Sequence, residues 1–445
     1  MSAATWRGRL GAVRRSRVTA IAGSIVGTSV VTSALGFVFW TVAARSLPAA
    51  TVGQLGSATA ASLLLGEFGI LGCGTLLISH LGTASPVRQR RLLVTAVAVS
   101  TGATGLLAAA FGVGAWLLIP SFAFLAPARA TFWWLLAAAA LTALGGVLDQ
   151  AMLVLGRPVN QVIRNAVASG LKVLLLAAAL LAGYSGVDWP LAGWVVGQVA
   201  ACLLAARAAW RLTRTTHRVT VGEVRGTLRR YWPEAARHHG MNVALAAPSV
   251  LQPVIVAAVV TAESNALFTT VRLVSTFAFM APYALAMGLF AASADDPQAG
   301  RQRARVVFRM SLALSLALYG VLFVTAPLIL TVFGHDYAAG GVTYLRIIAL
   351  GCPLLVFKDQ YIARMRAART LGPVMPYVLT ATALEIAGTL AGAMVADLTG
   401  ALAGWLLALG LGALWVSWQD RAADRPTPPL PGPPPRQPTT AGSSR

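Results

Sequence analysis

Charged side chains lie inside long apolar segments of this chain, where a charge is costly and usually has a function. Lys172 and Arg272 fall well inside two such segments, and Arg346 lies nearer the end of a third. An arginine guanidinium holds a phosphate or pyrophosphate as a planar fork, whereas a lysine ammonium holds it as a point charge. We therefore expect these three residues to bind an anionic ligand.

Carboxylic acids have a similar placement and are candidates for ion coupling or gating: Glu67, Glu385, Asp149 and Asp359. A carboxyl group in this setting can take up a proton or pair with a cation. A structural alternative stays open, in which acids and bases neutralise one another, for example Glu67 with Lys172. Arg164 and Lys358 are expected to extend toward the inner membrane surface instead.

The segments that carry these residues are long enough to cross a membrane as helices. Hydrophobic residues make up 57% of the chain and charged residues only 11%. In lipid the backbone must satisfy its own hydrogen bonds, so spanning segments are helices or closed barrels. Runs of about twenty apolar residues indicate helices. The composition therefore predicts an all-α integral membrane protein.

About twelve transmembrane helices follow from the apolar runs, and the arginines between them predict their direction. The predicted spans are 19–44, 55–80, 92–119, 132–156, 160–183, 189–209, 238–262, 265–292, 306–334, 342–363, 373–396 and 399–418. Arginines gather in alternate gaps, as at 88–91, 211–237, 301–305 and 364–369. Cytoplasmic loops carry such an excess. The chain is therefore predicted to lie in the cytoplasmic membrane as a multi-pass protein, N-in and C-in.

The longest arginine-rich gap divides the chain into two six-helix lobes. The predicted parts are a basic cytoplasmic N-terminus (1–18), an N-terminal six-helix lobe (19–209), a cytoplasmic linker (210–236), a C-terminal six-helix lobe (237–419) and a disordered Pro-rich cytoplasmic tail (420–445). Two lobes of the same orientation are typical of parallel repeats. Asp149-Gln150 and Asp359-Gln360, each near the inner end of a span, echo this repeat. Pro248 and Pro253 predict bends in the first helix of the second lobe.

Several functions are disfavoured by the residue types. The net charge of +21 would suit a nucleic-acid partner, but the arginines follow the gaps between spans, so no nucleic acid is expected. The cysteines Cys73, Cys202 and Cys352 lie within apolar runs and have no disulfide or metal spacing. No nucleotide-binding loop, zinc motif or Ser/His/Asp arrangement is visible. We expect no cofactor, no metal and no catalytic residue, hence a secondary transporter rather than an enzyme.

Two stretches resemble polysaccharide flippases of the multidrug/oligosaccharidyl-lipid/polysaccharide (MOP) exporter superfamily. Residues 36–81 are similar to the opening hairpin of that family, with an aromatic-rich helix, a corner at Ala44-Arg45 and Leu47-Pro48, and a glycine-rich second helix. Residues 267–292 are similar to the eighth span of the family, and Phe333, Gly334 and Tyr337 to its Phe-Gly-x-x-Tyr loop. The resemblance extends over the whole membrane part.

The resemblance implies two six-helix lobes around a V-shaped cavity that work by alternating access. It implies flipping of a polyprenyl-pyrophosphate-linked oligosaccharide for cell-surface polysaccharide biosynthesis. Membrane lipids, and a glycan polymerase and glycosyltransferases, would be partners. Arg272 is placed like an arginine in the eighth span of related flippases.

Departures from the family leave other functions open. Lipid II flippases of the superfamily usually have fourteen spans, two more than are predicted here. Cation-coupled multidrug exporters often carry an acid in the first span; the first predicted span has none, although Glu67 and Glu385 keep that alternative open. A membrane glycan polymerase or ligase is disfavoured because no long outer loop is predicted, and a scaffold for glycan assembly is a further alternative.

Overall fold

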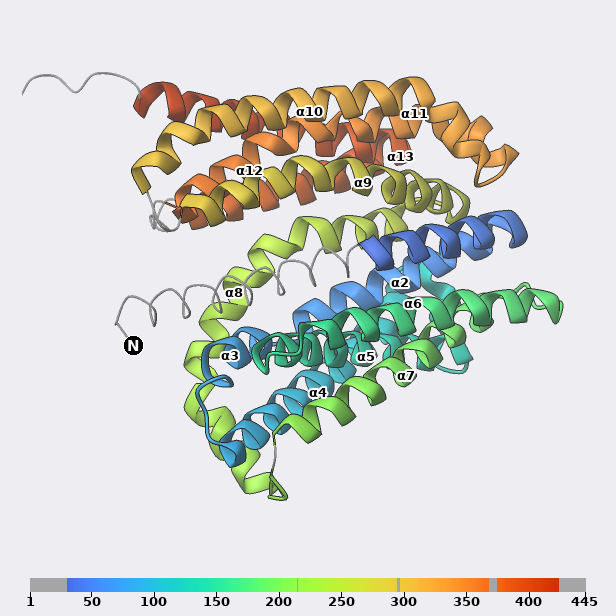
Figure 1. The fold of residues 1–445 in the computed structure, drawn as a ribbon. Coiled ribbons are helices and arrows are strands. Elements are labelled where there is room, and N and C mark those ends of the chain that lie inside the picture. Colours follow the sequence, from blue (N-terminus) through green and yellow to red (C-terminus); the bar gives the residue numbers. More distant parts are fainter. Residues whose placement is uncertain (1–29, 214, 294–296, 368–373, 424–445) are drawn as a thin grey trace, which may run out of the picture.

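The computed structural model describes residues 30–213, 215–293, 297–367 and 374–423. The predicted basic N-terminus and, from residue 424, the predicted tail lie outside these ranges. The described chain is helical throughout its length, as Figure 1 shows. Its elements are a helix at Val30–Ser46, α2 (Ala49–Gly69), α3 (Cys73–His80), α4 (Pro86–Leu118), η1 (Pro120–Leu125), α5 (Ala130–Val154), α6 (Pro158–Leu181), α7 (Asp188–Leu212), α8 (Val221–Val259), α9 (Ala262–Ser293), α10 (Pro297–Thr331), α11 (His335–Ala349), α12 (Gly351–Ala367) and α13 (Val374–Ala423).

Eight helices in the described ranges are long and apolar enough to cross a membrane, or nine if the bent pair α2 and α3 forms one span. The helix Val30–Ser46 is a shorter apolar helix, and α13 contains a kink at Ala396 and Asp397 that joins two helices. The prediction of an all-helical membrane fold is confirmed. The count of twelve spans, their direction and the lobe boundaries stay predictions.

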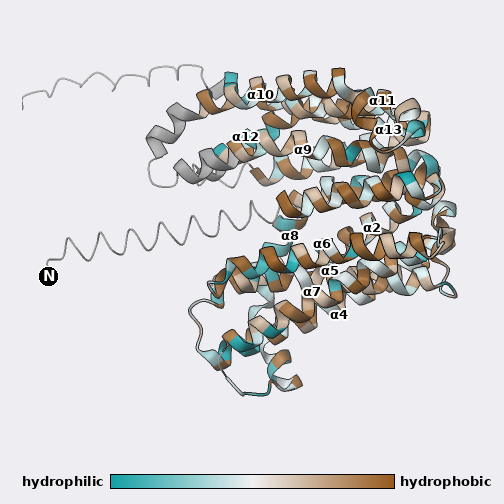
Figure 2. Cartoon of the chain, turned by 45° about the vertical axis from the view of Figure 1, so that its right-hand side comes forward, coloured by the Kyte–Doolittle hydropathy of each residue, from teal (hydrophilic) through white to brown (hydrophobic). Residues whose placement is uncertain are grey.

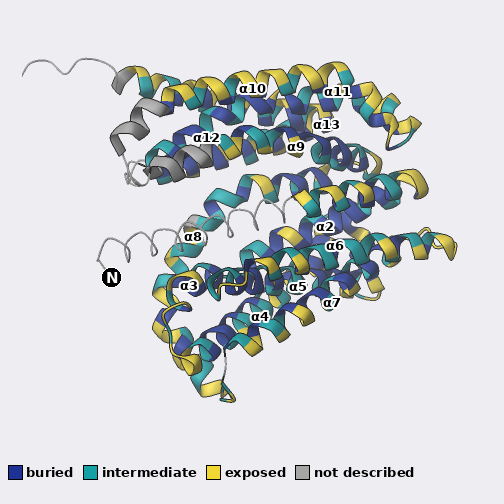
Figure 3. Cartoon of the chain, in the orientation of Figure 1, coloured by how far each residue is buried: buried dark blue, intermediate teal, exposed yellow. Residues whose placement is uncertain are grey.

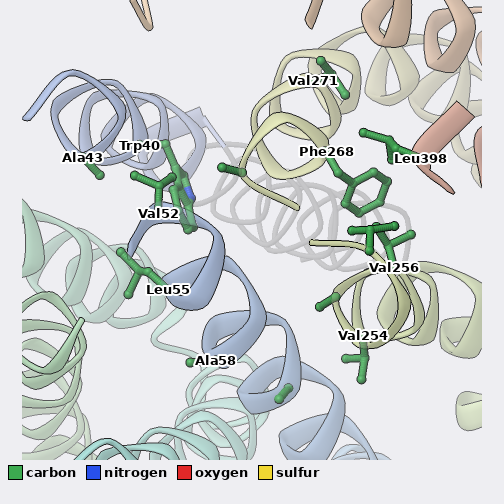
Figure 4. Packing of buried hydrophobic residues seen from close by; sticks show 14 of the residues in the cluster. Trp40, Ala43, Val52, Leu55, Ala58, Val254, Val256, Phe268, Val271 and Leu398 are labelled. Carbon is green, nitrogen blue, oxygen red and sulfur yellow. The ribbon is translucent and has the colours of Figure 1, made fainter. Parts of the chain in front are cut away.

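The helices form two groups (Figure 1). In the first, α4, α6 and α7 pack around α5, which also contacts α2; in the second, α10, α11 and α12 pack on α9, and α13 packs on α12 and α8. Contacts of α2 with α8 and α9 join the groups. The core crosses this junction, where Val52 and Leu55 lie on one side and Val256 and Phe268 on the other (Figure 4).

The outer surfaces of the helices are apolar. Brown, hydrophobic positions extend along the helices in Figure 2, and many of the outward positions are exposed in Figure 3. Leu118, Leu181 and Val395 are 81%, 90% and 87% exposed. A water-soluble protein rarely leaves so much apolar surface uncovered, whereas lipid covers it at no cost. The surface therefore agrees with a membrane location.

The predicted span 55–80 is broken in the structure. A bend of 48° separates α2 from α3, and Gly72 at the bend has φ +73°. A Cβ atom at Gly72 would lie 2.1 Å from the carbonyl oxygen of Ala235 in α8. Only glycine allows both a positive φ and so close an approach of another backbone. The break between α2 and α3 is therefore also the place where α8 packs against them.

The expected linker 210–236 is largely helical. The first half of α8 begins at Val221 behind a capping box, in which the side chain of Thr220 accepts from the N–H of Glu223 and Glu223 accepts from the N–H of Thr220. Such a box satisfies two of the free N–H groups at a helix start. From there α8 continues without a break into the membrane segment Asn242–Val259.

Within α13 two small-residue pairs form a tight helical hairpin, and its packing can be tested. Gly392→Ala should lower the unfolding temperature of the purified protein, because its Cβ would lie 1.9 Å from the carbonyl oxygen of Gly400. Overpacking of this kind costs about 1–3 kcal/mol. Gly410→Ala, in the same helix but with open space around it, should leave the temperature unchanged or raise it. Scanning fluorimetry in detergent measures both, and equal temperatures would contradict the tight hairpin.

Candidate functional site

The two helix groups meet closely at one end of α2 and α9. Asn265 Nδ2 donates to the carbonyl oxygen of Gly53 at 2.8 Å and to Ser57 Oγ at 3.0 Å. A Cβ at Gly53 would lie 1.7 Å from the carbonyl oxygen of Ala262. Backbone therefore rests on backbone here, and no passage remains between the two helices at this point.

A second contact closes the same end of the molecule. Arg45, just before the end of the helix Val30–Ser46, donates from Nε to the carbonyl oxygen of Val332 at 2.7 Å and from Nη2 to that of Thr331 at 3.1 Å. These carbonyls lie at the C-terminal end of α10, which ends at Thr331, and the C-terminus of a helix favours a cation. The rings of Phe37 and Phe333 meet beside them, 5.2 Å apart.

Arg272 lies next to this closed end. It follows Asn265 by seven residues, about two helical turns, and so shares its face of α9. Its Nη2 donates to the carbonyl oxygen of Ser249 in α8 at 2.5 Å. Pro253 explains why that oxygen is available, because proline four residues later has no N–H to bond it. The half-buried guanidinium has no carboxylate within ion-pair distance among the described residues.

Lys172 in α6 is held by aromatic rings. Its Nζ lies 4.2 Å from the ring centroid of Trp194 in α7 and 5.4 Å from that of Phe39. Ring faces attract cations, and most strongly where water is scarce. No ion pair involves Lys172 in the described part of the chain, so the predicted alternative of a Glu67–Lys172 pair is absent there.

Arg346 in α11 lies over the ring of Phe323 in α10, 4.5 Å from its centroid, and its Nε donates to the carbonyl oxygen of Phe323 at 3.0 Å. Arg346 therefore lies between α10 and α11. None of the described contacts joins it to Arg272 or Lys172, so the three predicted cations do not form one cluster.

Asp149 belongs to a buried polar network. Arg164 Nε and Nη2 each donate to one of its carboxylate oxygens at 2.6 Å, and Asn165 Nδ2 adds a bond of 3.1 Å. Gln198 Oε1 accepts from Arg164 Nη1 at 3.4 Å. A Cβ at Gly145 would lie 2.6 Å from that nitrogen, so α5 leaves room for the guanidinium.

Glu385 pairs in the second group of helices. Lys358 Nζ donates to its Oε1 at 2.8 Å, and the indole Nε1 of Trp405 donates to its Oε2 at 3.2 Å. The expectation that Arg164 and Lys358 extend to the inner surface is therefore wrong. Each cation lies against a carboxylate on a neighbouring helix, because pairing inside the protein removes the cost of an isolated charge.

Glu67 and Asp359 differ from the other two acids. Both are half-buried, and the described contacts include no hydrogen bond or ion pair for either. Glu67 follows Gly56 by eleven residues, about three turns, and so lies on the α2 face that meets α9. The four predicted acids therefore divide into two sets. Asp149 and Glu385 form ion pairs with neighbouring helices, whereas the carboxyl groups of Glu67 and Asp359 form no ion pair among the described residues.

Sequence reasoning missed the residues that close the junction. Arg45 entered only as part of the corner Ala44-Arg45 and Leu47-Pro48, with no contact expected of it, and Asn265 was not singled out. Asn265 directly follows Glu263 and Ser264 at the start of an apolar segment, so its polar side chain does not stand out in the sequence. Its partner, the backbone of Gly53, carries no side-chain signal at all.

The buried pair can be tested by removing one charge or both. Asp149→Asn should destabilise the protein by about 3–5 kcal/mol, because Arg164 would keep a buried charge without its counter-ion. Asp149→Leu combined with Arg164→Met should recover much of that loss, because no buried charge remains. Thermal unfolding in detergent measures the three proteins. An unfolding temperature of Asp149→Asn equal to that of the unaltered protein would show that the pair adds little to stability.

The sequence and the fold of this chain were compared with those of known proteins. The family of polysaccharide biosynthesis proteins matches residues 264–428, while no curated protein matches the sequence. Among the similar solved structures is lipid II flippase MurJ in an inward closed conformation (10% identity, TM-score 0.72, 88% of this chain and 86% of that one). Two others are multidrug resistance MATE family transporters of the MOP superfamily, one in an inward-facing conformation (14%, 0.65, 90% and 98%) and one in an outward-facing conformation (13%, 0.54, 92% and 96%).

The sequence match and the structural matches cover different shares of the chain. The polysaccharide biosynthesis match covers most of the second group of helices, and the structural likeness extends over both groups. At these identities the structural likeness is one of fold. The resemblance seen in the sequence is thus accompanied by a likeness of fold: this chain is a membrane protein with the fold of MOP superfamily transporters, and its residues 264–428 match the model of the polysaccharide biosynthesis protein family.

Proposed function

We propose that the chain is a flippase that moves a polyprenyl-pyrophosphate-linked oligosaccharide across the cytoplasmic membrane for cell-surface polysaccharide biosynthesis. The polysaccharide biosynthesis match supports the pathway, and the fold shared with a lipid II flippase supports a lipid-linked substrate. A glycan polymerase and glycosyltransferases would supply and use that substrate. The protein acts as a secondary transporter and catalyses no covalent step.

The observation that carries this proposal is the uneven neutralisation of charge within the described helices. Asp149 and Glu385 have cationic partners, whereas Lys172, Arg272 and Arg346 contact only rings and carbonyl oxygens. Dipoles and rings stabilise a cation but leave its charge uncancelled. A pyrophosphate would supply the missing anion, and without such cations it could not leave water for the membrane interior.

Arg272 and Lys172 would contact the substrate most directly, one in each group of helices. Arg272 uses one of its five N–H donors on Ser249, which leaves donors free for a bidentate phosphate contact. Arg346, eleven residues after the start of α11, would act at a depth similar to that of Arg272, ten residues after the start of α9. Glu67 and Asp359, whose carboxyl groups have no described partner, are the proposed coupling or gating acids, with Asp149 and Glu385 holding the helices that carry them.

The close contact between α2 and α9 at one end of the protein supports a mechanism of alternating access. The contact of Gly53 with Asn265 and the bonds of Arg45 close one end. The fold is also more similar to the inward-facing than to the outward-facing MATE structure. We infer that the chain is inward-facing and that opening outward separates α2 from α9. The two groups of helices, in the bounds 19–209 and 237–419, would move as lobes around the linker.

Twelve spans result if each bent or paired element crosses once. The helix Val30–Ser46, α2 with α3, each of α4–α10, α11 with α12, and the two halves of α13 then form the two sets of six. Contacts between gaps support the alternation. The residues that flank the gap between α3 and α4 meet the first half of α8 through His80–Glu234 and Arg91–Glu223. Ser121, in the gap after α4, donates to the carbonyl oxygen of Ala257 at the far end of α8.

The direction of the chain can be measured with single cysteines. The native cysteines are buried, so an impermeant maleimide should label little of the unaltered protein. Ser185→Cys and Thr216→Cys place thiols at exposed positions, predicted outside and inside respectively. Intact cells should label Ser185→Cys alone and inverted vesicles Thr216→Cys alone. The reverse pattern would contradict N-in and C-in.

Transport can be tested in cells that lack the native chain. Arg272→Gln and Lys172→Gln should each abolish surface glycan and raise the pool of lipid-linked oligosaccharide, because the pyrophosphate loses its counter-charge. Mass spectrometry of polyprenyl-linked sugars measures the pool and names the glycan. Arg129→Gln is the matched control, since Arg129 is exposed at the start of α5, and it should transport normally. Membrane levels of every variant must be equal.

Two outcomes would contradict the proposal. Normal surface glycan in both site variants would contradict the proposal that Arg272 and Lys172 bind the pyrophosphate. Unchanged lipid pools after deletion, together with new sensitivity to cationic drugs, would favour the second candidate, a cation-coupled multidrug exporter. The half-buried Glu67 without a described partner and the MATE-like fold support that candidate.

A further inference from the structure

A cleft of about 430 Å³ lies at the surface between the start of α4 and the first half of α8. Its lining includes three arginines, Arg88, Arg91 and Arg230, together with Tyr231 and a single carboxylate, Glu223. No residue of the proposed transport site lines it. Three guanidinium groups around one concave surface are the arrangement that binds phosphate groups.

The single carboxylate is already satisfied. Glu223 accepts from Arg91 Nη2 at 2.5 Å, from the backbone N–H of Thr220 at 2.9 Å, and lies 3.1 Å from the ring nitrogen of His217. The Thr220 N–H is the main reason that the pKa of Glu223 lies below its ordinary value, so the carboxylate stays ionised and bound to these groups at neutral pH.

The remaining arginines keep their charge available. Arg88 donates to the hydroxyl of Tyr231 and lies over its ring, 5.9 Å from the centroid, and Arg230 lies 5.6 Å from the same centroid. Neither is paired with a carboxylate in the described chain, and Nε of Arg91 is buried without an acceptor. One tyrosine thus holds two guanidinium groups at the cleft, with an unsatisfied donor beside them.

The surroundings of the cleft indicate where the phosphate comes from. The first half of α8 lies across the ends of α3 and α4 (Figure 1) and exposes Trp232 together with Arg225, Arg229 and Arg237. Tryptophan is enriched at membrane interfaces, and basic residues on the cytoplasmic side attract anionic headgroups. With the direction proposed above, the cleft opens at the level of the headgroups of the cytoplasmic leaflet.

We propose that this cleft binds the phosphate of an anionic phospholipid headgroup. The lipid phosphate would accept from Arg88 and Arg230, and its position would join α4, in the first group of helices, to α8, which continues to the junction with the second. The proposal depends on the proposed direction of the chain and not on the transported substrate.

Native mass spectrometry of the full-length protein in detergent tests the proposal, with phosphatidylglycerol as the anionic probe and phosphatidylcholine as the neutral one. The unaltered protein should retain phosphatidylglycerol in preference to phosphatidylcholine. Arg88→Gln combined with Arg230→Gln should bind the first phosphatidylglycerol about 25-fold more weakly, because each arginine near a headgroup contributes about a factor of five and the two factors multiply. Arg225→Gln combined with Arg237→Gln removes the same charge from exposed positions of α8 that do not line the cleft, and should lose much less affinity than the cleft variant.

Arg230 is exposed and makes no hydrogen bond within the described part of the chain, so Arg230→Gln alone tests the cleft even if the double variant unfolds, and should weaken binding about fivefold. Equal losses in the cleft variant and the matched variant would overturn the proposal, because binding would then follow surface charge alone. Competition by millimolar inorganic pyrophosphate without preference for the anionic lipid would also overturn it, because the cleft would then bind a soluble anion. Lipid binding is measured without transport, so its failure is distinguishable from failure of the proposed flippase function.

Discussion

A charge inside a membrane protein must be met by the protein itself, because lipid offers neither water nor counter-ions. This constraint arranges the interior of the chain. Asp149 in α5 pairs with Arg164 in α6, and Lys358 in α12 pairs with Glu385 in α13. In the proposed twelve-span order, each pair joins the fourth helix of its lobe to the fifth. In the first lobe the fourth helix carries the acid and the fifth the base, and in the second lobe this order is reversed. The two lobes therefore join the same two helices by an ion pair, but with different residues.

The same constraint applies to the backbone where α8 bends. Pro248 and Pro253 each leave a carbonyl oxygen four residues earlier without its usual donor. Thr382 of α13 donates to the oxygen of Ala244, and Arg272 of α9 donates to the oxygen of Ser249. Each freed oxygen is thus bonded by a side chain from another helix. The sequence predicts the bends, because the prolines are visible, but it does not reveal which helices supply the donors.

Features that depend on composition and local pattern could be predicted, and features that depend on contact between distant segments could not. Apolar runs indicate the helices, and the charges within them mark Lys172, Arg272 and the four acids. The partner of Asp149 was missed because residues 149 and 164 lie on different helices, and the pattern of one chain does not say which helix faces which. Arg45 was missed for the same reason, because its acceptors at residues 331 and 332 lie in the other half of the chain. The partner that a side chain meets depends on how the helices pack against one another. That packing depends in turn on glycines such as Gly53, which allow two helix backbones to approach closely.

Under the proposed function, the bond between Arg272 and Ser249 would link ligand binding to the shape of a helix. Arg272 holds the Ser249 oxygen with one donor and would hold a pyrophosphate with the others, at a level where Pro253 has already removed one backbone hydrogen bond of α8. A shift of the ligand would therefore be transmitted to α8 at this weakened turn. Because α8 runs without a break from this point to the surface half that lies on α3 and α4, ligand binding in the interior would be coupled to the position of α8 at the opposite end of the helix.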